Sequence, residues 1–185
     1  MTDWRRVLSN FWVEPFLYNG KQYSSAEHAF HAEKFYMVAS LRRGEQQKAA
    51  KAYADQFSTE FSQLSDADIK KRGGKSGFAM TTQEVNRWAE ISEERMTSVL
   101  EHKFTQCHIA KRVLLATGNS TLVVDTRGGQ AETTSQAAIP RYPNRCLRAA
   151  SKLIVGQARA PALAVPGIRM LGVDAAPEIH GTLDY

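Results

Sequence analysis

The chain has 185 residues, of which 43% are hydrophobic and 23% charged, and these values are ordinary for a single soluble domain with a sizeable core. Its net charge of +5 and isoelectric point near 9.3 favour an anionic partner such as a nucleotide, a phosphate or a nucleic acid. No run of residues reaches membrane-spanning length and residues 1–9 lack the apolar segment of a signal peptide, so we expect a cytoplasmic protein without membrane association.

The first expected element is a β-hairpin. The aromatic-rich segments 12–18 and 21–23 flank Asn19-Gly20, which is the strongest two-residue signal for a hairpin turn. A helix over 23–38 is predicted to follow the hairpin directly.

The helix predicted over 23–38 carries the densest group of chemically active side chains. At 3.6 residues per turn, Glu27, His31 and Lys34 fall on one face, and His28 falls on a neighbouring one. An acid, an imidazole and an ammonium in a row make this face a candidate catalytic or binding site.

Each of these residues also has a structural alternative. Ser24 and Glu27 fit an S-x-x-E capping box, in which Glu27 would only hold the start of the helix. His28 and His31 could be core-edge or surface histidines. Their spacing could bind a metal, but the H-E-x-x-H order and a third ligand are missing, so no metal site is expected.

The rest of the chain is predicted to be mainly helical. Apolar periodicity, capping residues and glycines predict helices over 45–57, 65–72, 84–104, 107–117 and 144–155, a strand over 121–125, and a loop over 127–143. Thr81 and Glu84 form a capping box before the long helix. We expect one domain over 1–156 and a C-terminal extension, rich in Ala, Pro and Gly, over 157–185.

Neither the glycine-rich segment 72–77 nor the pair of cysteines forms a familiar functional motif. The segment 72–77 is glycine-rich and basic, but residue 69 is isoleucine where a Walker loop needs glycine, and no strand precedes it. The loop could still offer backbone N–H groups to a phosphate, or be a surface turn. Cys107 and Cys146 form no C-x-x-C motif, so reduced thiols are expected.

Four blocks of the sequence match one known family in order and spacing. They are Ser9-Asn10-Phe11 with Pro15-Phe16 and Gly20; Glu27-His28 with Phe30, Ala32 and Lys34-Phe35; Trp88 with Met96, Lys103-Phe104, Gln106 and 114–118; and Asn144-Arg145. Across residues 7–155 the chain thereby resembles the NADAR superfamily, which includes the YbiA-like N-glycosidases. The resemblance implies an α+β fold: a mainly helical single domain with a small antiparallel sheet.

The resemblance also implies an enzyme that cleaves an N-glycosidic bond and uses no cofactor. Members act on phosphorylated ribosylamine intermediates of riboflavin synthesis, or remove ADP-ribose from guanine bases. Such a cleavage passes through an oxocarbenium-like centre at C1 of the ribose, which a nearby carboxylate stabilises. The implied partner is an anionic nucleotide-like substrate, either an ADP-ribosylated base, free or within a nucleic acid, or a ribosylaminopyrimidine phosphate.

The implied catalytic residues are Glu27 and Lys34. Glu27 would supply the carboxylate, and Lys34 would hold a phosphate or hydroxyl, attack an opened ribose as an amine, or simply pair with an acid. Substrate contacts are expected from Asn10, Phe11, His28, His31, Lys75, Trp88, Asp125, Asn144 and Arg145. Trp88 would stack on a base unless it is a core residue.

Two departures from the family pattern bear on the substrate. The loop over 126–143 contains no tryptophan where family members carry a Trp-Gly-rich loop. Gly73-Gly74-Lys75 stands where family members place Gly-Arg, so Lys75 or Arg72 would replace the arginine.

Three hypotheses follow: an N-glycosidase, a non-catalytic ADP-ribose or nucleotide-binding module, and a basic nucleic-acid-binding protein. Intact Glu27 favours the first, and the lack of an arginine-rich arm disfavours the third.

Overall fold

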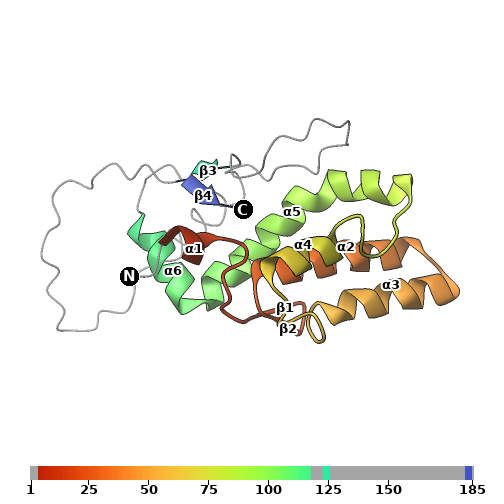
Figure 1. The fold of residues 1–185 in the computed structure, drawn as a ribbon, viewed down its shortest axis with the longest axis horizontal. Coiled ribbons are helices and arrows are strands. Elements are labelled where there is room, and N and C mark those ends of the chain that lie inside the picture. The colour runs from red at the N-terminus through yellow and green to blue at the C-terminus, as the bar shows by residue number, and fades with distance from the viewer. Residues whose placement is uncertain (1–3, 118–122, 126–181, 185) are drawn as a thin grey trace, which may run out of the picture.

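The structure is a computed structural model of the chain, and it describes residues 4–117, 123–125 and 182–184. Helices dominate this part, and two pairs of short strands accompany them (Figure 1). The elements are α1 (Trp4–Leu8), β1 (Phe16–Tyr18), β2 (Lys21–Tyr23), α2 (Ala26–Leu41), α3 (Gly44–Gln56), α4 (Asp66–Gly73), α5 (Thr82–Gln106), α6 (His108–Ala116), β3 (Val123–Asp125) and β4 (Thr182–Asp184). The predicted fold class, mainly helical with a small antiparallel sheet, is confirmed.

The expected hairpin is present as the antiparallel pair β1–β2, with Leu17 opposite Gln22. Asn19 and Gly20 both have positive φ, 48° and 75°, as a type I′ turn requires. The first strand is shorter than expected because Pro15, which has no N–H for a ladder, precedes it.

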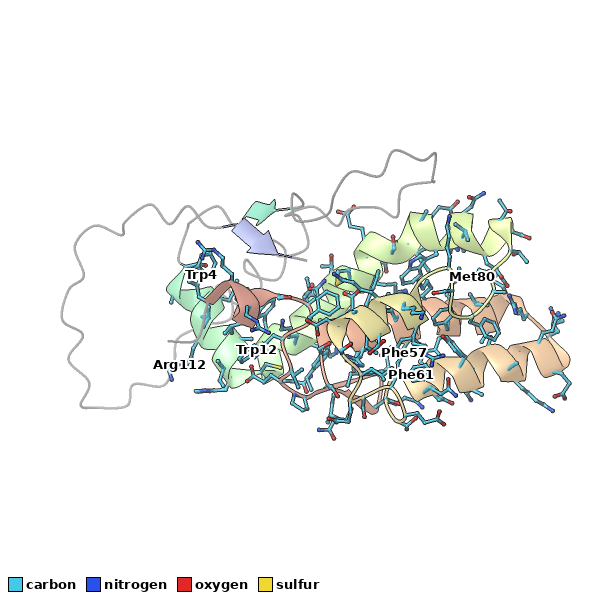
Figure 2. All side chains as sticks on the ribbon, viewed as in Figure 1. Trp4, Trp12, Phe57, Phe61, Met80 and Arg112 are labelled. Atoms are coloured by element: carbon cyan, nitrogen blue, oxygen red, sulfur yellow. The ribbon has the colours of Figure 1, made fainter. Side chains whose placement is uncertain are left out.

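Helix α2 lies at the centre of the helical part. It packs against α3 on one side and α5 on the other, and α4 covers part of it (Figure 1). Because both flanks are covered, its buried positions run around most of the helix and include Ala29, Phe30, Ala32 and Phe35. Phe57 and Phe61, labelled in Figure 2, follow α3, and their rings contact each other and Tyr53.

The long helix α5 has the predicted capping box. The Thr81 hydroxyl accepts the Glu84 N–H at 3.2 Å, and the Glu84 carboxylate accepts the Thr81 N–H at 2.7 Å. The predicted apolar stripe is buried at Trp88, Met96, Val99, Leu100 and Phe104, while Ile91 is only half-buried. This stripe faces α2 and strand β1.

Helices α3, α4 and α6 lie within a residue or two of their predicted bounds. Helix α6 is held by a residue far away in sequence: the Glu14 carboxylate accepts the N–H groups of Ile109 and Ala110 at 2.9 and 3.1 Å. An anion at a helix N-terminus is favoured by the helix dipole. The segment between helix α1 and the hairpin is thereby fastened to the end of the bundle.

The strand predicted over 121–125 is present as β3, and β4 pairs with it in parallel. Strand β4 belongs to the segment expected as an extension after residue 156, and it also contacts helix α1. The predicted loop over 127–143, the predicted helix over 144–155 and most of the extension lie outside the described residues.

Candidate active site on helix α2

Glu27, His31 and Lys34 lie on one face of α2, as their spacing predicts. Nε2 of His31 lies 3.1 Å from Oε1 of Glu27, one helical turn away. Their side chains are only 9% and 13% exposed, respectively. The Glu27 side chain is thus largely buried and lies beside an imidazole.

The capping box expected at the start of this helix is wrong. Helix α2 begins at Ala26 with Ser25 at the N-cap, and the Ser25 hydroxyl makes no cap hydrogen bond. The hydroxyl of Ser24 instead donates to the carbonyl of Ser62 at 2.7 Å, so it cannot cap the helix. Glu27 is free of the capping role and its carboxylate turns to His31.

The backbone of Glu27 is fixed by the turn before the hairpin. Its N–H donates to the carbonyl oxygen of Asn10 at 3.0 Å. This N–H belongs to the first turn of α2, where no helical carbonyl is available to accept it. Asn10 is buried, and its Nδ2 donates to Sδ of Met96 at 3.6 Å. The Ser9-Asn10-Phe11 block therefore fixes the backbone position of Glu27 at the start of α2.

Three basic side chains lie around the Glu27 carboxylate. Burial alone would raise its pKa, but His31, Lys70 and Lys34 outweigh burial and hold the pKa of Glu27 below its ordinary value. Burial lowers the pKa of Lys34 to about 8, although Glu27 opposes the shift. Near neutral pH the site therefore holds an ionised carboxylate and an amine that loses its proton more readily than a surface lysine.

Helix α4 covers this face of α2 through its last residue. Lys34 Nζ donates to the carbonyl oxygen of Gly73. The Cα of Gly73 lies so close to the His31 ring that a Cβ there would be 2.2 Å from Nδ1. Among the described residues, neither ring nitrogen of His31 has a hydrogen bond of good geometry, because the contact with Glu27 is close but poorly aligned.

Helix α4 also brings Lys70 to the site. The Lys70 ammonium lies 4.6 Å from the centroid of the Phe11 ring, and its charge contributes to the low pKa of Glu27. Lys70 is exposed and Phe11 is buried. Lys70 was not among the residues expected at the site, and Gly73 was expected only as part of a loop that could bind a phosphate.

His28 has both ring nitrogens occupied by the protein. Nδ1 lies 2.8 Å from the Ser25 hydroxyl, and Nε2 lies 3.1 Å from the carbonyl oxygen of Phe61. Since a carbonyl can only accept, Nε2 carries the proton and Nδ1 accepts from Ser25. Burial lowers the pKa of His28, which favours this neutral form. The ring connects helix α2 to the segment after α3.

The other expected site residues lie on other elements or outside the described residues. Trp88 is buried, with its ring centroid 4.9 Å from that of Phe30, in the contact between α5 and α2. Lys75 is exposed in the segment after α4. Asp125 ends strand β3, of which only the backbone is described. Asn144 and Arg145 lie outside the described residues.

The described residues contain no group of three or more His, Cys, Asp or Glu side chains that could hold a metal ion. No helix among them is both long enough and apolar enough to cross a bilayer.

The chain matches one known protein domain. The model of the NADAR domain matches residues 2–130, well over half of the sequence. The chain belongs to the NADAR family. The matched region includes Glu27, His31 and Lys34 but ends before Asn144 and Arg145. No curated protein matches the chain.

The NADAR fold is also seen in a solved structure. The NMR structure of the E. coli protein YbiA is 20% identical to this chain, with a TM-score of 0.55. The match covers 85% of this chain and 83% of the YbiA chain. At this level of identity the similarity supports the fold of the NADAR protein and leaves its chemistry to be argued from its own residues.

Proposed function

We propose that this NADAR protein is an N-glycosidase, which hydrolyses the bond between ribose and the nitrogen of a base or an amine. The observation that carries the proposal is the Glu27 carboxylate: largely buried, 13% exposed at its side chain, and kept ionised by three nearby basic residues. In the reaction the C1–N bond breaks, its electron pair leaves with the nitrogen, and C1 becomes positively charged until water attacks.

The low pKa of Glu27 favours one role over another. A carboxylate whose pKa is held down is a weak base, but it stays negative at neutral pH. We therefore assign Glu27 to electrostatic stabilisation of the C1 cation and to orientation of the attacking water. The proton that water loses can pass to solvent or to the leaving nitrogen.

Lys34 is the second candidate catalytic residue. With a pKa of about 8, its protonated form can donate to the departing nitrogen, and its neutral form can attack an opened ribose as an amine. Its ammonium donates to the Gly73 carbonyl, so either role requires that this hydrogen bond be exchanged for one to the substrate.

The proposed substrate is anionic and nucleotide-like, either an ADP-ribosylated base or a ribosylaminopyrimidine phosphate. Lys70 is the basic residue best placed to attract it, since it lies over Phe11 and acts on Glu27. His31 and Asn10 are assigned to the support of Glu27, and His28 to the fold. The neutral form of His28 leaves no ring nitrogen free for a ligand.

The test is direct. The protein is incubated with DNA carrying ADP-ribosylated guanine, with NAD, and with a ribosylaminopyrimidine phosphate, and released base is measured by mass spectrometry. Glu27→Gln should lower turnover at least ~100-fold while the urea midpoint stays close to that of the natural chain. Glu90→Gln, which alters a surface ion pair with Arg87, is the matched control and should change neither.

Two results would contradict the proposal, the first in the role of Glu27 and the second in the reaction itself. Full turnover by the Glu27→Gln variant would remove Glu27 from the reaction. Tight calorimetric binding of ADP-ribose without cleavage of any substrate would instead support a nucleotide-binding module.

A further inference from the structure

A buried lysine of helix α5 contacts the turn that precedes the hairpin. Lys103, on helix α5, is 1% exposed. Its ammonium donates to the carbonyl oxygen of Ser9 at 2.5 Å and lies 5.1 Å from the centroid of the Phe104 ring. Among the described residues, no carboxylate lies within ion-pair distance of it.

Stability does not explain a lysine at this position. Burying an ammonium without a carboxylate partner is costly, and burial lowers the pKa of Lys103 to about 7 although Cys107 and Glu14 oppose the shift. The Ser9 carbonyl does not need this donor, because it also accepts the Trp12 N–H at 3.1 Å. A methionine would fill the same space without a charge.

The bond from Lys103 leads to Glu27 in two steps. Ser9 begins the turn that contains Asn10 and Phe11, and the Phe11 N–H donates to the Ser9 hydroxyl at 3.2 Å. Asn10 then accepts the Glu27 N–H at 3.0 Å. Any shift of the Ser9 carbonyl is therefore passed to the first turn of α2.

We propose that Lys103 is a positioning residue for the candidate active site: it holds the Ser9–Trp12 turn where the Asn10 carbonyl fixes the backbone of Glu27. The consequence for turnover rests on the proposed glycosidase function, whereas the effect on the Glu27 backbone does not. The residue is too deeply buried to touch substrate, so it acts on the reaction only through the turn.

The hydrogen exchange rate of the Glu27 amide tests the proposal without any substrate. In Lys103→Met, exchange of this amide should become at least ~10-fold faster, because the Ser9 carbonyl then keeps only the Trp12 N–H and the turn that carries the Asn10 carbonyl is held less firmly. The Ala29 amide is the internal control, since it donates to Ser25 within the same helical turn at 3.3 Å and should keep its protection.

Turnover and stability supply the second measurement. A small displacement of Glu27 should lower kcat by ~10- to 100-fold and leave KM within ~3-fold. The melting temperature of Lys103→Met at pH 6 should be no lower than that of the natural chain, because a buried charge has been removed. If Lys103 only supported the fold, Lys103→Met would lower the melting temperature and leave kcat unchanged.

Two control variants separate positioning from general damage. Lys48→Met removes a lysine from the surface of α3, where it pairs with Glu45, and should leave exchange, turnover and melting unchanged. Phe104→Leu loosens the core next to Lys103 but keeps the bond to Ser9, so it should lower the melting temperature and leave the Glu27 amide selectively protected.

The outcomes are distinct. Faster exchange at Glu27 alone, with lower kcat, supports the proposal. Unchanged exchange at Glu27, or equal loss of protection at Ala29, overturns it. If the natural chain cleaves none of the substrates, the glycosidase proposal fails and the two amides still decide the role of Lys103.

Discussion

Replacing Gly73 with alanine should destabilise the protein, although alanine is the better helix former. Gly73 ends helix α4, where alanine by propensity alone would add up to ~1 kcal/mol of stability. The new methyl group, however, would lie 2.2 Å from Nδ1 and Cε1 of His31 and 2.3 Å from Cγ. Nonbonded carbon atoms pack at about 3.5 Å, so the ring and the helix must separate by roughly 1 Å.

The His31 ring has little room to make that movement. The Phe57 ring lies 5.8 Å away by centroid and the Phe30 ring 5.9 Å away, and the Glu27 carboxylate lies 3.1 Å from Nε2. Overpacking of this kind typically costs ~1–3 kcal/mol, which exceeds the gain in propensity. We therefore expect a net loss of about 1–2 kcal/mol for Gly73→Ala.

A double-mutant cycle measured by urea unfolding isolates this contact. In the background of His31→Ala the space is open, and Gly73→Ala should be neutral or stabilising by up to ~1 kcal/mol, which gives a coupling of ~1–3 kcal/mol. Lys71→Ala, an exposed change on the same helix, reports propensity alone. A neutral or stabilising Gly73→Ala with His31 present would refute the packing argument.

The remaining predictions concern charge. Lys103 and Lys34 have folded pKa values of about 7 and about 8, below that of a free lysine, so the unfolded chain binds more protons above pH 7 and the free energy of unfolding should rise with pH. Between pH 7 and about pH 9.5, Lys103 alone should raise the free energy of unfolding by roughly 3 kcal/mol. Urea unfolding of Lys103→Met over the same pH range should lack this increase. Lys70→Met should raise KM ~3- to 10-fold and reduce the dependence of KM on salt, whereas Lys75→Met should change KM less than ~2-fold. Equal effects would contradict the preference for Lys70, and a larger effect of Lys75→Met would place the anion site nearer Lys75.

The local parts of the fold were predictable from sequence because their causes are local. Asn19-Gly20 can adopt positive φ, so the hairpin turn follows from two residues. The Thr81–Glu84 box and the apolar spacing after it were enough to predict helix α5. The alignment of Glu27 with His31 needed only the helical period.

The failures came from contacts between residues far apart in the chain. Ser24 looked like a cap because its spacing to Glu27 is right, but the Ser62 carbonyl, from the segment after α3, takes its hydroxyl. No local pattern could show that Gly73 would lie against His31, or that Lys70 would reach Phe11. The pairing of β4 with β3 likewise joins segments far apart in the sequence.

The charges around Glu27 explain how one site could attract an anion and still keep a carboxylate at its centre. Lys34 and Lys70 both act on Glu27, so two lysines face one acid and the local balance favours a negative substrate. The same cations stabilise the ionised carboxylate, which makes it a poor proton acceptor. A cleavage that depends on charge stabilisation at C1 uses both properties, whereas one that depends on proton abstraction by Glu27 would be slowed by the second. Under the proposed glycosidase function, the charges around Glu27 therefore favour dissociative loss of the base, followed by attack of water.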